Sequence, residues 1–582
     1  MLTAGRVVAA YGNMITVVFD QDVRQNEVAY VKTADGSRLK SEVIRIQGKQ
    51  CNLQVFEDTK GVKTGDQVEF TGDLLTVELG PGLLKRIYDG LQNPLPELAQ
   101  QAGLFLQRGL YLDALDRTAV WDFTPQVEPG DRVEAGDVLG VVPEGKFQHQ
   151  IFVPFSFLGR ATVKRVAGPG LYKVADVICE VEGEDGRRHE LNMIQRWPIK
   201  IPLRHYQERL LPVEPLVTGC RIIDSFFPVA KGGTACIPGP FGSGKTVLQQ
   251  LISRYADVDI IVVAACGERA GEVVETLREF PHLEDPYTGK TLMDRTVIIC
   301  NTSSMPVAAR EASIYTAVTL GEYYRQMGLN VLLLADSTSR WAQALREMSG
   351  RLEEIPGEEA FPAYLQSRIA EFYERAGIVR LKDGRIGSVS VIGTVSPAGG
   401  NFEEPVTQGT LAVVGSFLGL TWARSNARRF PAIDPLISWS KYLDQMRERL
   451  NQTDPEWVDL IKKSQHLVFE GNEVKKRMDV VGEEGTSQSD FIIFLKSEFL
   501  DTVFLQQNAF DQVDAYNTMD RQISSFRLVT EVLEKDIKIE GKDQAREMFF
   551  KLSAQFKNLN SSAFGSPEHR KFEAEIHQTI KE

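Results

Sequence analysis

The sequence contains no run of apolar residues long enough to cross a membrane, although 43% of its 582 residues are hydrophobic. A spanning helix needs about 20 consecutive apolar residues, so we expect no transmembrane segment. Residues 1–8 also lack the apolar core of a signal peptide. We therefore expect a cytoplasmic protein that is only peripherally associated with any membrane, through partner proteins.

Cysteine is scarce and scattered. The chain has six cysteines and no C-x-x-C pair, and several of them lie in apolar runs typical of strands. In such surroundings cysteine behaves as a small hydrophobic residue. We predict reduced core residues, neither disulfides nor metal ligands, at Cys51, Cys179, Cys220, Cys236, Cys266 and Cys300.

Basic charge is in deficit, with 66 Lys and Arg residues against 79 Asp and Glu residues and a net charge of −13. This balance argues against a surface built for non-specific nucleic-acid binding. The 25% of charged residues is otherwise that of an ordinary globular protein. The length exceeds what one hydrophobic core supports and indicates roughly three or four domains.

One short stretch has the pattern of a phosphate-binding P-loop, G-x-x-x-x-G-K-T. Its glycines let backbone N–H groups face a polyphosphate, and the helix expected after it adds the positive end of its dipole. The lysine supplies a cation for the outer phosphates, and the threonine hydroxyl is a suitable ligand for Mg²⁺. A strand candidate (234–237) precedes the loop and a helical pattern (247–252) follows it, as the motif requires. The predicted nucleotide-binding residues of the loop are Gly239, Pro240, Phe241, Gly242, Ser243, Gly244, Lys245 and Thr246.

The hydrophobic pattern changes several times along the chain and predicts a multidomain α/β protein. Short β-rich runs come first, alternating apolar strands and helices follow the P-loop, and helical spacing dominates the end. The predicted parts are an N-terminal β-barrel (1–75), a connector of turns around a short helix (76–109), an inserted β-rich bulge domain (110–190), a P-loop α/β domain (191–438) and a C-terminal helical domain (439–582).

The inserted part has the rhythm of flattened lipoyl-like barrels, V-x-x-G-D-x-V-x-x-G-D-x-L, over residues 127–140. A carrier domain would display a lysine for modification, and Lys146 lies in a loop-like stretch. Its flanks, Glu144-Gly-Lys-Phe147, do not resemble a carrier site, so we favour a structural insertion. We expect an independent unit whose removal leaves the α/β domain folded.

Four continuous apolar runs after the P-loop predict parallel strands covered on both faces, over residues 258–266, 296–300, 331–335 and 388–394. Asp336 ends the third run, which is the Walker B pattern and places a carboxylate near the Mg²⁺ of a P-loop. The first run leads into Glu268 and Arg269, where a carboxylate can orient a water toward a γ-phosphate. The alternative interpretation is that Glu268 and Arg269 form an ion pair on the surface with no role in catalysis. Arg310 and Arg340 suit a phosphate, an inter-subunit contact or a structural ion pair equally well.

Together, several segments resemble the catalytic A subunit, or alpha chain, of V-type rotary ATPases of archaea, vacuoles and some bacteria. The segments span 239–246, 267–269, 334–342, 372–377 and 396–400. The resemblance covers essentially the whole chain, and the inserted part resembles the bulge of that subunit. It implies a RecA-like ATP-binding domain and ATP hydrolysis or synthesis coupled to H⁺ or Na⁺ transport. It also implies a ring of alternating A and B subunits, three of each, central and peripheral stalk subunits, and a separate membrane sector.

The resemblance also implies roles for individual residues. Lys245 contacts the triphosphate, Glu268 orients the water and Arg269 supports it. Thr246 binds Mg²⁺, with Asp336 and Glu272 holding the metal through waters.

Phe430 and Phe510 resemble the aromatic residues that clamp the adenine ring, although each would also suit a hydrophobic core. The charge that neutralises the transition state would come from the B subunit.

Two departures from the family pattern stand out. Residues 267–272 are G-E-R-A-G-E where the family usually has G-E-R-G-N-E, and Ser243 stands where eukaryotic members carry cysteine.

Two rival functions remain at this point. A hexameric nucleic-acid translocase is disfavoured by the acidic balance and the insertion, and a non-catalytic ring subunit is disfavoured by the presence of Lys245 and Glu268.

Overall fold

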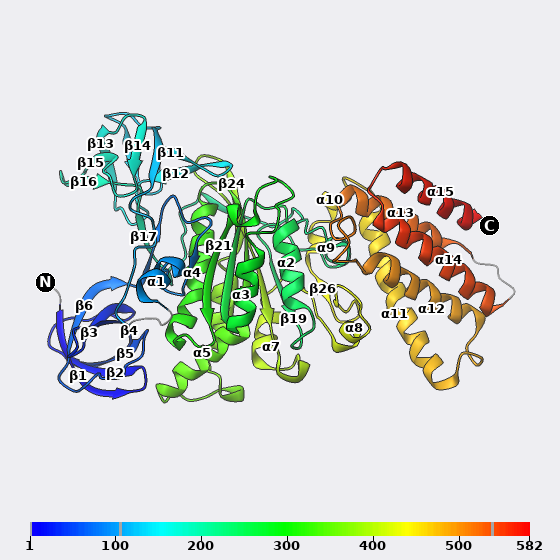
Figure 1. Cartoon of the computed structure of the whole chain (residues 1–582), viewed down its shortest axis with the longest axis horizontal. Coiled ribbons are helices and arrows are strands. Elements are labelled where there is room, and N and C mark those ends of the chain that lie inside the picture. The colour runs from blue at the N-terminus through cyan, green and yellow to red at the C-terminus, as the bar shows by residue number, and fades with distance from the viewer. Residues whose placement is uncertain (1–2, 104–107, 537–540, 582) are drawn as a thin grey trace.

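The computed structural model describes residues 3–103, 108–536 and 541–581. A barrel, a central α/β layer and a group of helices follow one another along an elongated molecule, with a smaller β unit beside them (Figure 1). The predicted multidomain α/β fold is confirmed. Within the ranges given, no helix has both the length and the apolar character needed to span a bilayer. All six cysteines are buried and free, as predicted.

The first six strands close into an antiparallel barrel in the order β1-β2-β5-β4-β3-β6. Side chains alternate between core and surface; in β2, for example, Ile15, Val17 and Phe19 are buried. Closure leaves no strand edge open to pairing with another chain. The strands are β1 (Thr3–Tyr11), β2 (Met14–Phe19), β3 (Glu27–Lys32), β4 (Arg38–Gln47), β5 (Gln50–Val55) and β6 (Gln67–Leu74).

A ten-stranded sheet forms the centre of the molecule, and its main path runs β26-β25-β19-β24-β22-β20-β21-β8. Every neighbouring pair from β25 to β8 is parallel. The inner strands are apolar and buried because helices cover both faces, as their continuous apolar runs predict. The strands are β8 (Ile87–Tyr88), β18 (Glu208–Leu210), β19 (Thr234–Pro238), β20 (Ile260–Glu268), β21 (Thr296–Thr302), β22 (Asn330–Asp336), β23 (Gly377–Arg380), β24 (Ile386–Val395), β25 (Ser416–Phe417) and β26 (Trp439–Ser440).

Helices pack on both faces of this sheet, and α4 is buried along most of its length against β20, β21 and β22. The helical elements of this part are η1 (Ile222–Phe226), α2 (Lys245–Tyr255), α3 (Ala270–Glu279), η2 (Leu292–Arg295), α4 (Val307–Arg325), α5 (Thr338–Arg351), η3 (Glu358–Ala360), α6 (Leu365–Tyr373), η4 (Ala398–Gly400), α7 (Pro405–Leu411) and α8 (Trp422–Asn426).

The connector is more than turns around a helix. It contains β7 (Thr76–Leu79), which pairs with β17 (Gln195–Pro198), and β8, which extends the central sheet beside β21. Its helix, α1 (Leu95–Ala102), follows these strands. The short strands were missed because each has so few residues that no alternation can be seen in the sequence.

The inserted part consists of two four-stranded sheets, β10-β13-β15-β16 and β12-β11-β9-β14. This unit contacts the α/β part, and its expected independence on removal stays a prediction. His149 lies between Glu144 (Nδ1 to Oε2, 2.6 Å) and Tyr323 of α4 (Nε2 to Oη, 2.8 Å), and one sheet shares the core of the α/β part. Lys146 therefore sits in the turn of a hairpin that is fixed to α4. The strands are β9 (Val120–Pro125), β10 (Arg132–Glu134), β11 (Val138–Glu144), β12 (Phe147–Phe152), β13 (Arg160–Val166), β14 (Gly170–Lys173), β15 (Cys179–Gly183) and β16 (Arg188–Leu191).

Helices make up the last part, where α11 and α12 form an antiparallel pair against α14 (Figure 1). The break between α11 and α12 spans 482–487. The helices are α9 (Tyr442–Gln445), α10 (Arg447–Leu450), α11 (Trp457–Val481), α12 (Gln488–Leu500), η5 (Asp501–Leu505), α13 (Met519–Glu534), α14 (Lys542–Ser561) and α15 (Pro567–Lys581).

Candidate active site

The P-loop lies at the carboxyl edge of the central sheet. β19 ends at Pro238, and β20 and β22 end at Glu268 and Asp336. These strands run parallel, with Ala265 in register with Asp336, so their carboxyl ends meet at one edge. The loop and both predicted carboxylates are thus brought to one place, and a cavity there is lined by Glu268, Asp336 and Thr246.

The loop adopts the compact form that its glycines permit. Gly242 and Gly244 have φ values of +77° and +90°, which residues with a Cβ rarely adopt. Ser243 donates a hydrogen bond from Oγ to the carbonyl of Pro240 at 2.8 Å, which closes the turn. Helix α2 starts directly afterwards at Lys245, so its N-terminal N–H groups and its dipole face the loop.

Lys245 lies across the loop and is 9% exposed. Its Nζ donates to the carbonyl oxygens of Gly239 at 2.8 Å and Pro240 at 2.9 Å. Burial lowers the pKa of the ammonium, and nearby carboxylates, led by that of Asp336, oppose this shift. A cation held at the loop in this way is placed to meet phosphate oxygens.

Three carboxyl groups crowd beside the lysine. Burial, the Asp336 carboxylate and a hydrogen bond with Glu272 raise the pKa of Glu268 to about 8. Burial also raises the pKa of Asp336, although its Oδ1 accepts a hydrogen bond of 2.6 Å from Oγ1 of Thr394. An acceptor with a pKa close to neutrality is well matched to take a proton from water.

Arg269 does not pair with Glu268 in the described structure. Its guanidinium lies 4.7 Å from the ring centre of Phe241, in a cation–π contact. The arginine charge that lowers the pKa of Glu268 is instead that of Arg340, at the start of α5.

The two arginines whose roles the sequence left undecided, Arg310 and Arg340, both approach the turn at Gly267. A Cβ built on Gly267 would lie 2.7 Å from Cβ of Arg340 and 3.0 Å from Cδ of Arg310. Arg310 donates from Nη2 to the carbonyl of Ser303 at 3.0 Å, and its buried Nε has no hydrogen-bond partner. Arg310 and Arg340 therefore flank the end of β20, which carries Glu268, from the side of α4 and α5.

The donor atoms around the cavity suit a hard divalent cation. A hydroxyl from Thr246 and carboxylates from Glu268, Glu272 and Asp336 line it, and all of these are oxygen ligands. No group of three or more His, Cys, Asp or Glu side chains in the described ranges could hold a metal alone. Mg²⁺ keeps several waters and binds through few protein groups together with substrate phosphates, and the hydroxyl and carboxylates named above are ligands of the kind it takes.

The two predicted base-binding aromatics, Phe430 and Phe510, lie in segments that are far apart in the chain but contact each other. The carbonyl of Phe430 accepts a hydrogen bond of 2.7 Å from the backbone N–H of Gln507, three residues before Phe510. The Phe510 side chain is 96% exposed. Neither phenylalanine lines the cavity beside the P-loop.

The chain matches four family models in order. They describe the ATP synthase alpha/beta family β-barrel domain (residues 7–72), the barrel-sandwich domain of the ATP synthase alpha/beta subunit (112–200), the nucleotide-binding domain of that family (219–440) and the C-terminal domain of V and A type ATP synthase (448–546).

Full-length relatives agree with these models. The chain is 60% identical to the V-type ATP synthase alpha chain of Treponema denticola, with 100% of this chain and 97% of the relative covered. It is 57% identical to the alpha chain of Protochlamydia amoebophila (99% and 97% covered) and 58% identical to that of Borreliella burgdorferi (100% and 99% covered). The chain belongs to the V-type ATP synthase alpha chains.

Members of this family are catalytic subunits of rotary ATPases, so the nucleotide site described above serves ATP hydrolysis or synthesis within a multisubunit complex coupled to ion transport. The predicted family, fold and enzyme class are confirmed. Neither rival function, the nucleic-acid translocase or the non-catalytic ring subunit, fits this membership.

Residues that the sequence did not single out also reach the site of this alpha chain. Gln249 lines the cavity, one helical turn after Thr246, and its buried Nε2 has no hydrogen-bond partner. Trp422 lies 3.9 Å from a Cβ built on Gly242 and is 47% exposed. The spacing of Gln249 from Thr246 was a usable signal, whereas nothing in the sequence near Trp422 indicates that it meets the P-loop.

Proposed function

We propose that this alpha chain turns over Mg·ATP with Glu268 as the carboxylate that orients the attacking water. The observation that carries this assignment is the position of Glu268 at the end of β20, in the cavity with Thr246 and Asp336. Lys245 and the loop N–H groups hold the phosphates, and Glu268 accepts a proton from the water as it attacks.

Mg²⁺ would be held by the hydroxyl of Thr246 and, through waters, by Asp336 and Glu272. When bound, the cation neutralises charge that develops on the transferring phosphate. Arg269 acts from outside this group: its stacking on Phe241 supports the loop side of the site, and Arg340 supplies the positive charge nearer to Glu268.

The specific partners are also part of this proposal. We infer a ring of alternating alpha chains and B subunits, three of each, in which a B subunit completes the site with a cation in trans. Support comes from the exposed side of the site, where Phe241 (63% exposed) and Trp422 present aromatic surface. Central and peripheral stalk subunits would connect the ring to a membrane sector that moves H⁺ or Na⁺.

The test is Glu268→Gln in the assembled ring. The amide keeps the size of the side chain but removes the proton acceptor, so we expect hydrolysis to slow by at least about 100-fold. ATP binding should remain close to that of the parent, because Lys245, the loop N–H groups and Mg²⁺ hold the phosphates. Single-turnover hydrolysis and equilibrium binding are measured on the same preparation.

Glu275→Gln is the matched control, since Glu275 lies on α3 just beyond the site and is exposed. It should leave both binding and hydrolysis unchanged. Hydrolysis near the parental rate in Glu268→Gln would show that Glu268 is not the catalytic carboxylate. Loss of binding together with hydrolysis would instead make the residue structural.

A further inference from the structure

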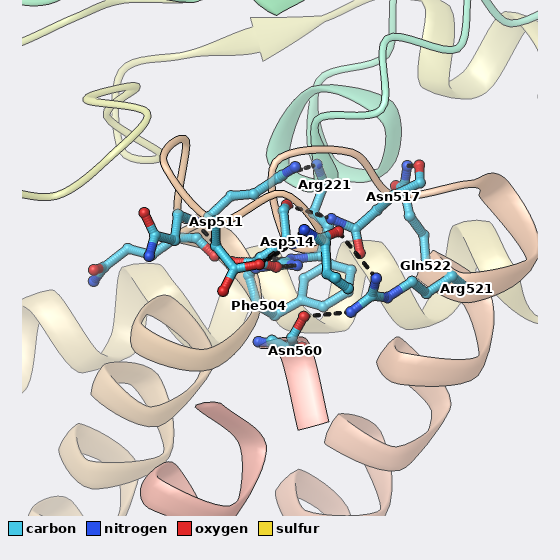
Figure 2. A network of polar contacts seen from close by, with 12 residues as sticks. Arg221, Phe504, Asp511, Asp514, Asn517, Arg521, Gln522 and Asn560 are labelled. Atoms are coloured by element: carbon cyan, nitrogen blue, oxygen red, sulfur yellow. Dashed lines mark hydrogen bonds and ion pairs between the residues drawn. The ribbon is translucent and has the colours of Figure 1, made fainter. Parts of the chain in front are cut away.

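A buried polar network joins the α/β part to the helical part (Figure 2). Its centre is Arg221, which is 1% exposed and directly precedes the π-helix η1. Its guanidinium donates from Nε to the carbonyl of Phe504 at 2.8 Å and also binds the carbonyl of Gln506 and the carboxylate of Asp514. One side chain thus holds the start and the end of the segment 504–514.

Gln507 adds a second set of contacts to the same segment. Its Oε1 accepts from the backbone N–H of Arg221 at 2.9 Å, and its Nε2 donates to the carbonyl of Gly219 at 2.9 Å. Its own backbone N–H donates to the carbonyl of Phe430 at 2.7 Å. Gln507 therefore connects both predicted base-binding regions to the segment that precedes η1.

The segment itself is braced at the far end of its loop. Asp514 Oδ2 accepts from the backbone N–H of Asn508 at 2.7 Å, and Asn517 donates its N–H to the carbonyl of Gly219 at 3.0 Å. Phe510 lies in the loop closed by these bonds, with no buried contact of its own to fix it. The position of its ring is therefore determined by the backbone of the loop and by what holds that backbone.

We propose that Arg221 and Gln507 are positioning residues for recognition of the purine base. They hold the 506–514 loop, which carries Phe510, against the backbone of Phe430, so that both aromatic residues are kept in place for a flat bicyclic base. This inference rests on the nucleotide site proposed above and on the base-binding roles that the resemblance implies for Phe430 and Phe510. It assigns a role in the reaction to two residues that touch neither the phosphates nor the base.

Two physical arguments favour a positioning role over a purely structural one. Arginine offers donors on three separate nitrogens in a rigid planar arrangement, so Arg221 can fix two carbonyls and a carboxylate at different positions, whereas the donors of lysine share one atom. The network also uses Arg221 and Gln507 to reach the loop of Phe510 and the backbone of Phe430 together, so its loss would displace both predicted base-binding regions at once.

The test compares ATP with CTP as substrates of the assembled ATPase carrying Arg221→Lys. Lysine keeps the charge and the backbone bond to Gln507 but releases the carbonyls of Phe504 and Gln506. We expect the KM for ATP to rise about 10-fold while kcat changes less than about 3-fold, because binding of the base is lost and the phosphate site is intact. The KM for CTP, which has a smaller ring, should change little, so the preference for ATP over CTP falls about 10-fold.

Gln507→Ala is the second variant, since it removes two hydrogen bonds and no charge. It should shift the KM for ATP and the base preference in the same direction by about 3-fold, and it carries the test if Arg221→Lys does not assemble.

Arg375→Lys is the matched control. Arg375 is equally buried and also pairs with one carboxylate, that of Glu322, and with a backbone carbonyl, that of Ile199, but it lies away from the loop. Arg375→Lys should leave the base preference unchanged.

Phe510→Ala separates this inference from the one on which it rests. If Phe510→Ala leaves the KM for ATP and the base preference unchanged, the base-binding assignment fails. If Phe510→Ala changes both but Arg221→Lys and Gln507→Ala change neither, the positioning role alone is overturned. An equal rise in KM for ATP and CTP in the Arg221 and Gln507 variants would also overturn it, because a general loss of structure has no base preference.

Discussion

Two groups of acidic residues in this chain are arranged in opposite ways. Beside the P-loop, Glu268, Glu272 and Asp336 crowd around one lysine, and the pKa of Glu268 rises to about 8. In the buried network around Arg221, Asp514 pairs with Arg221 itself. Asp224 accepts four hydrogen bonds there, from Thr218 N and Oγ1, Gly219 N and Gln522 Nε2.

The difference shows which group is complete without a ligand. Like charges held together cost free energy unless a cation or a proton separates them. A nucleotide with its metal brings that cation to the first group, while the second group already has its partners. We therefore expect changes in the first group to affect turnover and changes in the second to affect stability.

The largest expected effect is that of Lys245→Ala. It removes the buried cation that faces both the carboxylates and the incoming phosphates, so turnover of the assembled ring should fall by about 1,000-fold and nucleotide binding should weaken. Steady-state ATP hydrolysis and equilibrium nucleotide binding measure the two effects.

Lys290→Ala is a control for this change, because Lys290 is exposed in the segment before η2 and outside the cavity. It should hydrolyse ATP like the parent. Normal turnover in Lys245→Ala would show that the P-loop does not bind the phosphates. The contrast between the two acidic groups would then be unsupported.

Much of the first group was predictable from the sequence, because its chemistry is carried by short local patterns. The P-loop, Glu268 and Asp336 each lie at the end of an apolar run, and parallel strands bring such ends together. The roles of Glu272, Phe430 and Phe510 came only from resemblance. Arg269 was expected to support Glu268, but its side chain stacks on Phe241 instead.

Little of the second group could be predicted. Arg221 and Asp514 are separated by 293 positions, and neither lies in a recognisable pattern. The sequence also did not show that β8 joins the central sheet or that His149 fixes the insertion to α4, since both depend on contacts between distant segments. Patterns in sequence report local structure, and these features depend on tertiary packing.

The next prediction concerns the ion pair of Arg221. Asp514→Asn leaves a buried guanidinium without its carboxylate, so we expect a loss of about 3–5 kcal/mol in unfolding free energy. Calorimetry of the full-length chain should show a lower transition for the helical part.

Asp543→Asn is the comparison, because Asp543 pairs with Arg546 at a fully solvated position, its side chain being 95% exposed. That change should alter the unfolding free energy by less than about 1 kcal/mol. Equal effects from Asp514→Asn and Asp543→Asn would show that the network contributes no more than a surface pair.

The smallest expected effect is a pH dependence from Asp224. Burial raises its pKa to about 6, against hydrogen bonds that lower it. The groups facing it are neutral Thr218, Gly219 and Gln522, together with the thiol of Cys220, whose pKa burial raises to about 12. Between pH 4 and 6, therefore, Asp224 is the group in this cluster that titrates.

The sign of the effect follows from proton binding. The folded chain holds a proton on Asp224 up to about pH 6, whereas the unfolded chain releases it near the ordinary aspartate pKa of 3.8. The folded state thus binds more protons in this window, so the contribution of Asp224 to stability increases as the pH falls from about 6 to about 4. Asp224→Asn cannot gain this contribution, and its deficit in unfolding free energy should grow by about 1–3 kcal/mol over the same range. Subtracting the variant's stability from that of the parent at each pH removes the titration of all other carboxylates. A deficit that stays constant, or shrinks, as the pH falls would show that Asp224 is ionised throughout. Its hydrogen bonds would then outweigh the effect of burial on its pKa, in contrast to Glu268 beside the P-loop.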